Sequence, residues 1–159
     1  MSGPETPATR DRRLDSVPHE VVVHGPVGSL EEAAGLRGVA PSAVIKTLVV
    51  RRGEDDYVFV LVPGDRVIDW PKLRALLGVR RLAMPDAGEA FEATGYRRGT
   101  ITPLGSKGGW PVVADERVSR GPVSVGGGAP GVSLAMEGQD LVRLLGATVA
   151  DVTRPREDS

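Results

Sequence analysis

The strongest apolar run in the chain is Val-Ile-Lys-Thr-Leu-Val-Val at residues 44–50. Successive side chains of a strand point to opposite faces, and in this run both faces carry aliphatic residues. Such a pattern is typical of a central strand that is covered on both sides. Lys46 lies among these residues, where an ammonium group is costly to bury without an acceptor or a negative charge. We expect its amine to reach a cleft where a ligand supplies that partner; the alternative is a lysine that extends to solvent at the strand end.

Shorter apolar runs predict further strands, and Gly, Pro and capping residues separate them from short helices. Strands are expected at residues 20–24, 57–62, 79–83, 111–115, 121–125, 132–136 and 147–152. Helices are expected from an N-cap at Ser29 to Gly38, from Asp69 to Gly78, at residues 85–94, and at residues 140–145. The helix at residues 85–94 is expected to have Ala87, Ala90 and Phe91 on its inner face. This order predicts an α+β (mixed α/β) fold, with a curled, barrel-like mixed sheet and short helices around it.

The chain of 159 residues has the size of a single domain. Residues 1–13 are polar, charged and rich in proline without any periodicity, so we expect a disordered N-terminal tail. The folded domain is expected to span residues 14–153, and residues 154–159 are expected to form a C-terminal tail.

Composition narrows the classes of function. The net charge is −1, so no global basic field indicates nucleic-acid binding, and any contact with RNA must come from a local patch. The absence of cysteine excludes disulfides, a thiol nucleophile and cysteine-based zinc sites. No apolar run approaches the ~20 residues of a membrane span, and the polar N-terminus does not look like a signal peptide. We therefore expect a cytoplasmic protein with neither a membrane nor DNA as a partner.

Two segments rich in glycine follow the helix expected at residues 85–94. Residues 95–107 contain three glycines, Pro103 and three cations, a composition that excludes a helix interior. We expect a shaped loop whose backbone amides lie open near a ligand, with a plain surface hairpin loop as the alternative. Residues 126–131 spell G-x-G-x-x-G, but Pro130 and the strand that follows argue against a dinucleotide site, which needs a helix there.

The other residues offer little for other kinds of catalysis. His19 and His24 are too few for a metal site, and no G-x-S-x-G motif indicates a serine hydrolase. What remains is one lysine and two loops with free backbone amides. This combination suits the stabilisation of a developing oxyanion by N–H groups, while the lysine holds an anionic or carbonyl part of a substrate. No protein general base is evident, so a hydrolysis at this site would need a hydroxyl group from the substrate.

Three motifs together resemble one family. The strand at residues 44–50, the run Gly95-Tyr96 with Gly99-Thr-Ile-Thr-Pro103-Leu-Gly105, and Val125-Gly-Gly-Gly128 with Gly131 resemble the YbaK/EbsC/ProX-type aminoacyl-tRNA deacylases. These are free-standing relatives of the editing domain inserted in bacterial prolyl-tRNA synthetases. The resemblance implies hydrolysis of the ester that joins a wrong amino acid to transfer RNA, assisted by the 2′-hydroxyl of the terminal adenosine, without a metal or cofactor. The implied partners are the acceptor end of an aminoacyl-tRNA and an aminoacyl-tRNA synthetase.

The resemblance also implies roles for individual residues. Lys46 falls on the functional lysine of the family, and the loop from Gly99 to Pro103 falls on the segment whose amides hold substrate and water. The implied catalytic residues are Lys46, Gly99, Thr100 and Pro103. The implied substrate-binding residues are Thr47, Val22, Tyr96, Ile101, Thr102, Gly105, Gly126, Gly127, Gly128 and Ser133. Arg97 and Arg98, beside the loop, are expected to contact phosphate groups of the RNA.

Three positions depart from the pattern of the cysteine-specific members. Those members carry a tyrosine, a serine and an aspartate where this chain has Val22, Gly126 and Ser133. The reaction class is untouched, but the amino acid removed is open between cysteine, as in Cys-tRNA(Pro), and another small residue. The changes at Gly126 and Ser133 motivate an alternative, a non-catalytic RNA- or protein-binding module that keeps the fold.

Overall fold

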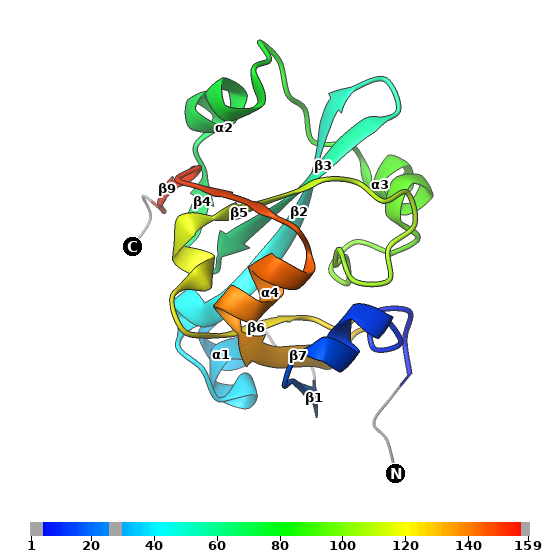
Figure 1. Cartoon of the computed structure of the whole chain (residues 1–159), viewed down its shortest axis with the longest axis vertical. Helices are drawn as coiled ribbons and strands as arrows, with labels where there is room; N and C mark the ends of the chain where they lie inside the picture. The colour runs from blue at the N-terminus through cyan, green and yellow to red at the C-terminus, as the bar shows by residue number, and fades with distance from the viewer. Residues whose placement is uncertain (1–4, 26–29, 157–159) are drawn as a thin grey trace.

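The structure, a computed structural model, describes residues 5–25 and 30–156 and forms a mixed α/β domain (Figure 1). Its strands are β1 (Glu20–Val23), β2 (Val44–Gly53), β3 (Asp56–Pro63), β4 (Arg66–Ile68), β5 (Val112–Asp115), β6 (Pro122–Gly126), β7 (Val132–Glu137), β8 (Thr148–Ala150) and β9 (Thr153–Pro155). Its α-helices are α1 (Leu30–Arg37), α2 (Trp70–Leu77), α3 (Ala87–Thr94) and α4 (Gly138–Leu144), and short 3-10 turns lie at Arg12–Ser16, Pro41–Ala43 and Glu116–Ser119. The predicted mixed α/β class is confirmed.

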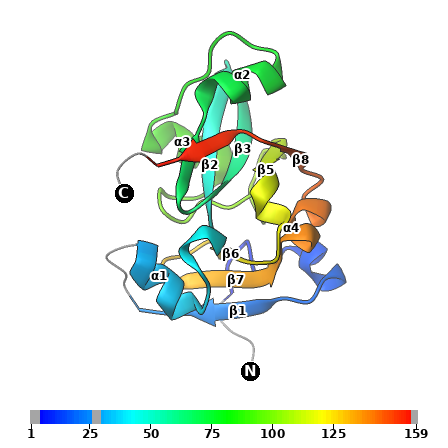
Figure 2. The same ribbon diagram turned by 90° about the vertical axis from the view of Figure 1, so that its left-hand side faces the viewer.

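Seven of the described strands form one continuous sheet in the order β1-β7-β6-β2-β3-β5-β8. The β2–β3 hairpin at its centre is antiparallel, whereas β2 with β6, β3 with β5, and β5 with β8 pair in parallel. Figure 2 shows β1 and β7 running across the direction of β2 and β3, so the sheet is strongly bent. Its two ends, β1 and β8, stay apart in the strand order, so the curled sheet is open and does not close into a barrel.

Two apolar clusters cover the two faces of the central hairpin. Alternation along β3 places Tyr57, Phe59 and Leu61 in one cluster, and the intervening valines of the same strand in the other. The first cluster includes Leu141 of α4, and the second includes Leu73 of α2. The central hairpin is therefore covered on both sides, as its continuous apolar pattern predicts.

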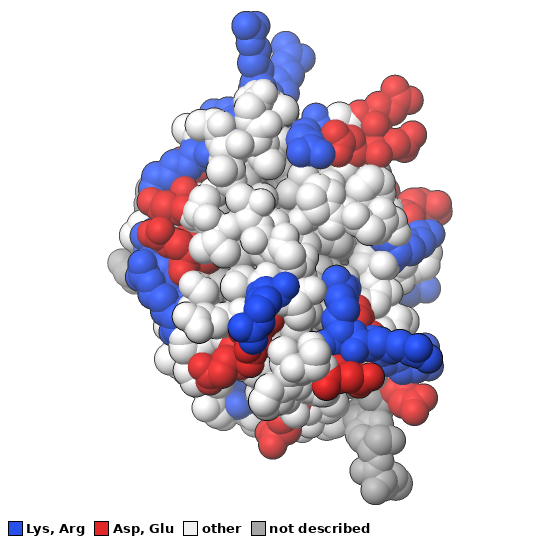
Figure 3. Space-filling view, in the orientation of Figure 1, with Lys and Arg blue, Asp and Glu red and all other residues white. Residues whose placement is uncertain are grey.

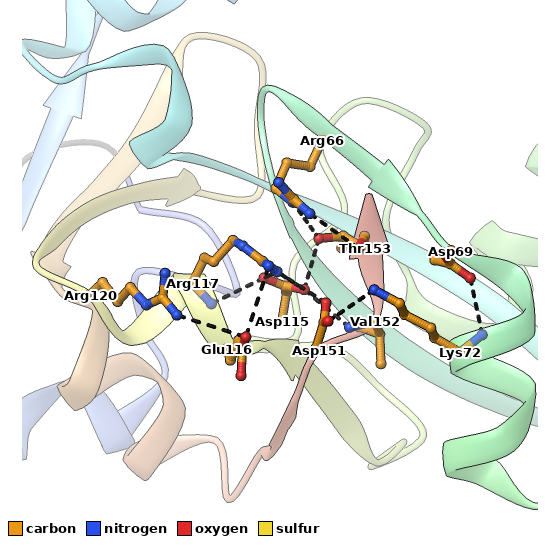
Figure 4. A network of polar contacts seen from close by, with 10 residues as sticks. All are labelled: Arg66, Asp69, Lys72, Asp115, Glu116, Arg117, Arg120, Asp151, Val152 and Thr153. Carbon is orange, nitrogen blue, oxygen red and sulfur yellow. Dashed lines mark hydrogen bonds and ion pairs between the residues drawn. The ribbon is translucent and has the colours of Figure 1, made fainter. Parts of the chain in front are cut away.

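Asp115, at the end of β5, organises a polar network between elements that are far apart in the chain (Figure 4). Its buried carboxylate accepts hydrogen bonds from the amide and guanidinium groups of Arg117, from the Val152 amide, and from the Thr153 hydroxyl at 2.8 Å. Burial alone would raise the pKa of Asp115, but these hydrogen bonds outweigh it and hold the pKa below its ordinary value. Thr153 accepts in turn from Nε of Arg66 at 2.7 Å, which joins β9 to β4.

The N-terminal segment differs from the expected disordered tail. The Thr6 hydroxyl donates to the Gly127 carbonyl at 2.6 Å, and the Asp11 carboxylate accepts from the Gly105 amide at 2.9 Å. Leu14 is buried in the first apolar cluster. Residues 5–13 are thus ordered by contacts with both glycine-rich loops, which the composition of the segment does not reveal; residues 1–4 lie outside the described part of the chain.

Two further segments differ from their expected structure. Residues 79–83 form no strand, and Ala83 makes only an isolated bridge with Arg51 of β2. Residues Thr153–Pro155 pair antiparallel with β4, so the expected C-terminal tail begins with an ordered strand. In both segments partners distant in sequence decide the outcome, and local propensity does not reveal them.

The helix boundaries follow their capping residues. Asp69 accepts from the Lys72 amide at the start of α2, and Gly78 ends that helix with φ +68°, as predicted. Of the three residues expected on the inner face of α3, Ala90 is buried as predicted, whereas Ala87 is exposed and Phe91 is 42% exposed. Ala93 and Thr94 complete the buried side of the helix. The N-cap expected at Ser29 lies outside the described residues.

Charged side chains of both signs alternate around a largely uncharged area on the face shown in Figure 3. No single-sign field covers that face, in keeping with a net charge of −1. Over residues 5–25 and 30–156, none of the helices has the length and apolar character needed to cross a bilayer.

Replacing Asp115 by asparagine should lower the free energy of unfolding by about 2–4 kcal/mol, because an amide cannot satisfy every donor that surrounds the carboxylate. Thermal or urea unfolding measures the change. The matched control is Asp56→Asn, which removes a partly exposed ion pair with Arg52 and should cost less than about 1 kcal/mol. Equal losses for the two variants would show that the buried network contributes no more than a surface pair.

Asp11 should make stability depend on acid pH. The hydrogen bond from Arg13 lowers the pKa of Asp11 from 3.8 to about 2. Because the folded-state pKa is depressed, this contribution is complete above about pH 4 and is lost as the pH falls toward 2. Asp11→Asn should therefore cost about 1–2 kcal/mol at pH 7 and progressively less below pH 4.

Denaturant unfolding at a series of pH values tests this prediction. Asp15→Asn, at an exposed position in the same 3-10 turn, is the control and should stay close to the parent protein. A cost of Asp11→Asn that stays constant down to pH 2 would contradict the assignment.

Candidate active site

An open stretch on the edge of β2 forms one wall of a cavity. β2 pairs with β3 from Ile45 to Gly53, but it pairs with β6 only at Val44 and Ile45. The next contact on that edge is the bridge from Arg51 to Ala83. A cavity of about 350 Å³ lies against this stretch, and every residue from 44 to 49 lines it. The cavity therefore follows the edge of the strand, not one of its faces.

The open edge presents unpaired backbone groups. The amide and carbonyl of Arg51 both bond to Ala83, so they point away from β3. In an antiparallel ladder every second residue is oriented in the same way. The N–H and C=O groups of Thr47 and Val49 therefore face the cavity edge, where no strand of the described chain pairs with them. These groups are available to a ligand.

The loop at residues 95–107 supplies another wall, through Arg98, Gly99 and Ile101. The amides of Thr100 and of residues 104–107 bond within the protein and hold the loop in shape. By contrast, no acceptor in the described residues bonds to the amides of Gly99 and Ile101. The same holds for the amides of Arg97, Arg98 and Thr102, so open amides are found at five positions of the described loop, of which Arg98, Gly99 and Ile101 line the cavity.

Other predicted residues of this loop stabilise its shape and do not line the cavity. The Tyr96 hydroxyl donates to the Leu104 carbonyl at 2.6 Å, across the loop. Burial raises the pKa of Tyr96 to about 12, so this donor keeps its proton. Thr102 is buried and accepts from the Leu104 amide, while the Thr100 hydroxyl donates back to the Arg97 carbonyl. These residues serve the site indirectly, by fixing the path of the backbone.

Pro103 and Gly105 lie against the N-terminal segment. The Pro103 carbonyl accepts from Arg13 at 3.5 Å. Gly105 has φ +67°, and a Cβ there would lie 2.2 Å from the Pro7 carbonyl oxygen, so this close approach requires glycine. Arg97, expected to contact phosphate, is exposed and lies over the ring of Phe91 at 5.6 Å. Pro103, Gly105 and Arg97 therefore do not line the cavity.

Lys46 lines the cavity and is half-buried, and its ammonium donates to the Arg66 carbonyl of β4 at 2.8 Å. Burial lowers the pKa of Lys46, the charge of Arg156 adds to this effect, and Asp65 opposes it. An ammonium group has three donors, so the bond to Arg66 leaves two for a ligand. Because the Arg66 guanidinium bonds to Thr153, the lysine is connected to the Asp115 network.

The three positions that depart from the family pattern lie side by side. Ser133 of β7 pairs with Val22 of β1 on one side and with Gly126 of β6 on the other. Gly126 lines the cavity, and the other two continue the same row away from it. The Ser133 hydroxyl is buried and has no hydrogen-bond partner in the described structure. Gly127 and Gly128 allow close packing of the loop, since a Cβ on either would approach neighbouring atoms within 3.1 Å.

Sequence reasoning missed Arg37, the last residue of α1. It lines the cavity, and its Nη1 group donates to the buried hydroxyl of Ser124 at 3.4 Å. Its Nε atom is buried without a partner among the described residues, and burial lowers the pKa of the guanidinium. No signal in the sequence marks this arginine, because it becomes a cavity residue only through the placement of α1 beside β2.

The cavity gathers cations without acids. Arg37, Lys46 and Arg98 line it, and its lining contains no Asp, Glu, His or Cys. In the described ranges, no three His, Cys, Asp or Glu residues are grouped in a way that could hold a metal ion. The site can bind an anionic or carbonyl-bearing ligand through N–H donors, and a proton acceptor for hydrolysis would come from the ligand or from water.

Comparison with known sequences matches the same part of the chain. The sequence model of the aminoacyl-tRNA editing domain covers residues 24–144. Proline–tRNA ligase of Thermoanaerobacter sp. (strain X514) is 32% identical over 106 residues, which make up 65% of this chain and 18% of the ligase. The ligase of Heliobacterium modesticaldum is 36% identical over 122 residues, 76% of this chain and 21% of the ligase. The chain thus matches only about a fifth of the length of these ligases.

Two other relatives match along most of their length. EbsC of Enterococcus faecalis, a proposed Cys-tRNA(Pro)/Cys-tRNA(Cys) deacylase, is 26% identical over 126 residues, 79% of this chain and 77% of that protein. The crystal structure of a proposed trans-editing enzyme for prolyl-tRNA synthetase has a TM-score of 0.83 at 27% identity, and the match covers 96% of this chain and 99% of that one. The residues that line the cavity all fall within the region covered by the domain model. The chain therefore belongs to the aminoacyl-tRNA editing domain family.

Proposed function

We propose that the protein is a trans-editing deacylase, which hydrolyses the ester between a wrong amino acid and the 3′-terminal adenosine of a tRNA. Membership of the editing-domain family supports the class of reaction. One observation carries the proposal to the level of the site: the open edge of β2, Lys46 and the free amides of Gly99 and Ile101 border a single cavity.

These groups suit the stages of ester hydrolysis. The amides of Gly99 and Ile101 stabilise the oxyanion that develops on the ester carbonyl. Lys46 keeps its bond to Arg66 and uses its remaining donors to hold oxygen atoms of the ester or the ribose. The Thr47 carbonyl on the open edge is a suitable acceptor for the α-ammonium group of the amino acid.

The substrate supplies the group that the cavity lacks. No lining residue is a carboxylate or an imidazole that would accept a proton from water. We infer that the 2′-hydroxyl of the terminal adenosine orients the water. The water attacks the carbonyl carbon, the bond to the 3′-oxygen breaks, and the proton of the water passes to that oxygen. The products are a free amino acid and a tRNA with a free 3′-hydroxyl.

The proposed substrate is Cys-tRNA(Pro) or a tRNA that carries another small amino acid, and the reaction takes place in the cytoplasm. The similarity to EbsC and to the editing region of proline–tRNA ligases supports this choice. Arg98 at the cavity and the exposed Arg97 beside it are placed to contact phosphates of the acceptor end. A prolyl-tRNA synthetase is the proposed protein partner, which would present the mischarged tRNA.

Lys46→Ala should lower kcat/KM for deacylation by at least about 100-fold, because it removes a positioned charge from the reacting centre. Release of labelled amino acid from a panel of mischarged tRNAs, including Cys-tRNA(Pro) and Ala-tRNA(Pro), measures the effect. Lys72→Ala, which removes an exposed ion pair with Asp151, is the matched control and should retain activity. Thermal unfolding should show both variants folded.

The same panel distinguishes the alternative. A parent protein that binds aminoacyl-tRNA but releases no amino acid from any member would support a non-catalytic RNA-binding module. The unusual row of Val22, Ser133 and Gly126 motivates this second candidate, because it departs from the cysteine-specific pattern beside the cavity.

Replacing the terminal 2′-hydroxyl by hydrogen should slow hydrolysis by at least about 100-fold, because the attacking water loses its orienting group. The amino acid is attached at the 3′-oxygen in both substrates, and single-turnover rates are compared. A 2′-deoxy substitution at the penultimate nucleotide is the control and should have little effect. Equal rates for the two terminal adenosines would refute the substrate-assisted step.

A further inference from the structure

We propose that Arg37 forms an anion-recognition subsite in the cavity and selects substrates that place a negatively charged oxygen group against it. The inference rests on the proposed function, since it takes an aminoacylated adenosine as the ligand. Two parts of such a ligand can supply the negatively charged oxygen group. One is the phosphate that joins the last two nucleotides, and the other is a carboxylate on the side chain of the amino acid.

The hydrogen bonds of Arg37 are incomplete. A guanidinium group has five N–H donors, and buried donors in proteins are normally paired. In the described structure Arg37 makes one long bond, of 3.4 Å, to Ser124, and its buried Nε makes none. The terminal N–H groups that have no partner among the described residues can bond to a ligand that enters the cavity.

The charge of Arg37 is also unbalanced. Burial lowers the pKa of its guanidinium, and none of the carboxylates that the structure describes forms an ion pair with it. Arg52 and Arg117, which are also partly buried, both pair with aspartates at 3.0–3.1 Å. Partial burial makes an unpaired cation less favourable, and a ligand in the cavity would supply the missing counter-charge.

Arg37 lies on the same side of the sheet as Lys46. Val44 and Ser124 are partners in the β2–β6 pairing, so their side chains share a face. Lys46, two residues after Val44, points to this face as well, whereas Thr47 points to the opposite one. The side chains of Ser124, which contacts the Arg37 guanidinium, and of Lys46 therefore point to the same face of the sheet, and both Arg37 and Lys46 line the cavity.

The shape of the group narrows the ligand. A guanidinium is a planar fork that matches the paired oxygens of a phosphate or a carboxylate, and such contacts are stronger than those between neutral groups. A neutral carbonyl would leave the charge uncompensated. Both observations favour a phosphate or a carboxylate over an uncharged polar group as the occupant of the subsite.

Binding measurements test this inference independently of turnover. Calorimetry compares adenosine 5′-monophosphate with adenosine, and the stable 3′-aspartyl-amide of 3′-deoxyadenosine with its asparaginyl isostere. The variants are Arg37→Gln and, as the matched control, Arg143→Gln. Arg143 lies in the last turn of α4, just as Arg37 ends α1, but it is exposed and pairs with Asp140.

The parent protein and Arg143→Gln should bind the charged member of one pair at least about tenfold tighter than its neutral counterpart, as expected for a charge-assisted contact. Arg37→Gln should abolish that preference. A preference for the monophosphate assigns the subsite to the terminal phosphate, and a preference for the aspartyl compound assigns it to the amino acid. Loss of the preference in Arg37→Gln supports the subsite even if no mischarged tRNA is hydrolysed.

Two results would overturn the inference. One is a parent protein with no charge preference in either pair, and the other is a preference that survives in Arg37→Gln. Thermal unfolding separates a binding role from a structural one. Removal of an unpaired buried charge should leave the midpoint unchanged or raise it. A lowered midpoint together with an unchanged preference would assign Arg37 to the fold and refute the subsite.

Discussion

The point at which β2 and β6 stop pairing determines where this protein can bind a ligand. A central strand normally has both of its edges occupied, but here one edge is free between Ile45 and Arg51. The N–H and C=O groups at such an edge are unpaired, and leaving them without hydrogen bonds costs free energy. The loop at residues 95–107 lies across the cavity from this edge and does not pair with it, so a ligand can form these hydrogen bonds. The chemistry of the site thus comes from an interrupted sheet more than from reactive side chains.

Lys46 connects this interrupted edge to the most strongly bonded part of the molecule. Its ammonium contacts the backbone of Arg66, whose guanidinium binds Thr153, whose hydroxyl binds the carboxylate of Asp115. Each link crosses between different strands, and the last is fully buried. The lysine is consequently held by a support that depends on correct assembly of β4, β5 and β9, and the geometry of the site is coupled to the global fold.

The local sequence pattern predicts correctly those helices and strands that are marked by a continuous apolar run or by capping residues at their ends. The apolar run at residues 44–50 identified the central strand, and Asp69 with Gly78 marked both ends of α2. The local pattern does not predict segments whose structure depends on contacts with residues far away in the sequence. The segment at residues 5–13 has the composition of a tail, yet Asp11 meets an amide of the glycine loop. Arg37 looks like an ordinary helix-end cation, and only the packing of α1 reveals its incomplete bonding.

The same non-local character concerns the order in which the site is completed. Thr6 and Asp11 find their partners in Gly127 and Gly105, at sequence separations of 121 and 94 residues. Contacts of such long range close late, because the intervening chain must first be arranged. During synthesis on the ribosome, the first described residues therefore wait for most of the domain before they can lock the two loops together. The N-terminal segment therefore completes its contacts with the two loops only after residues 105 and 127 have been synthesised.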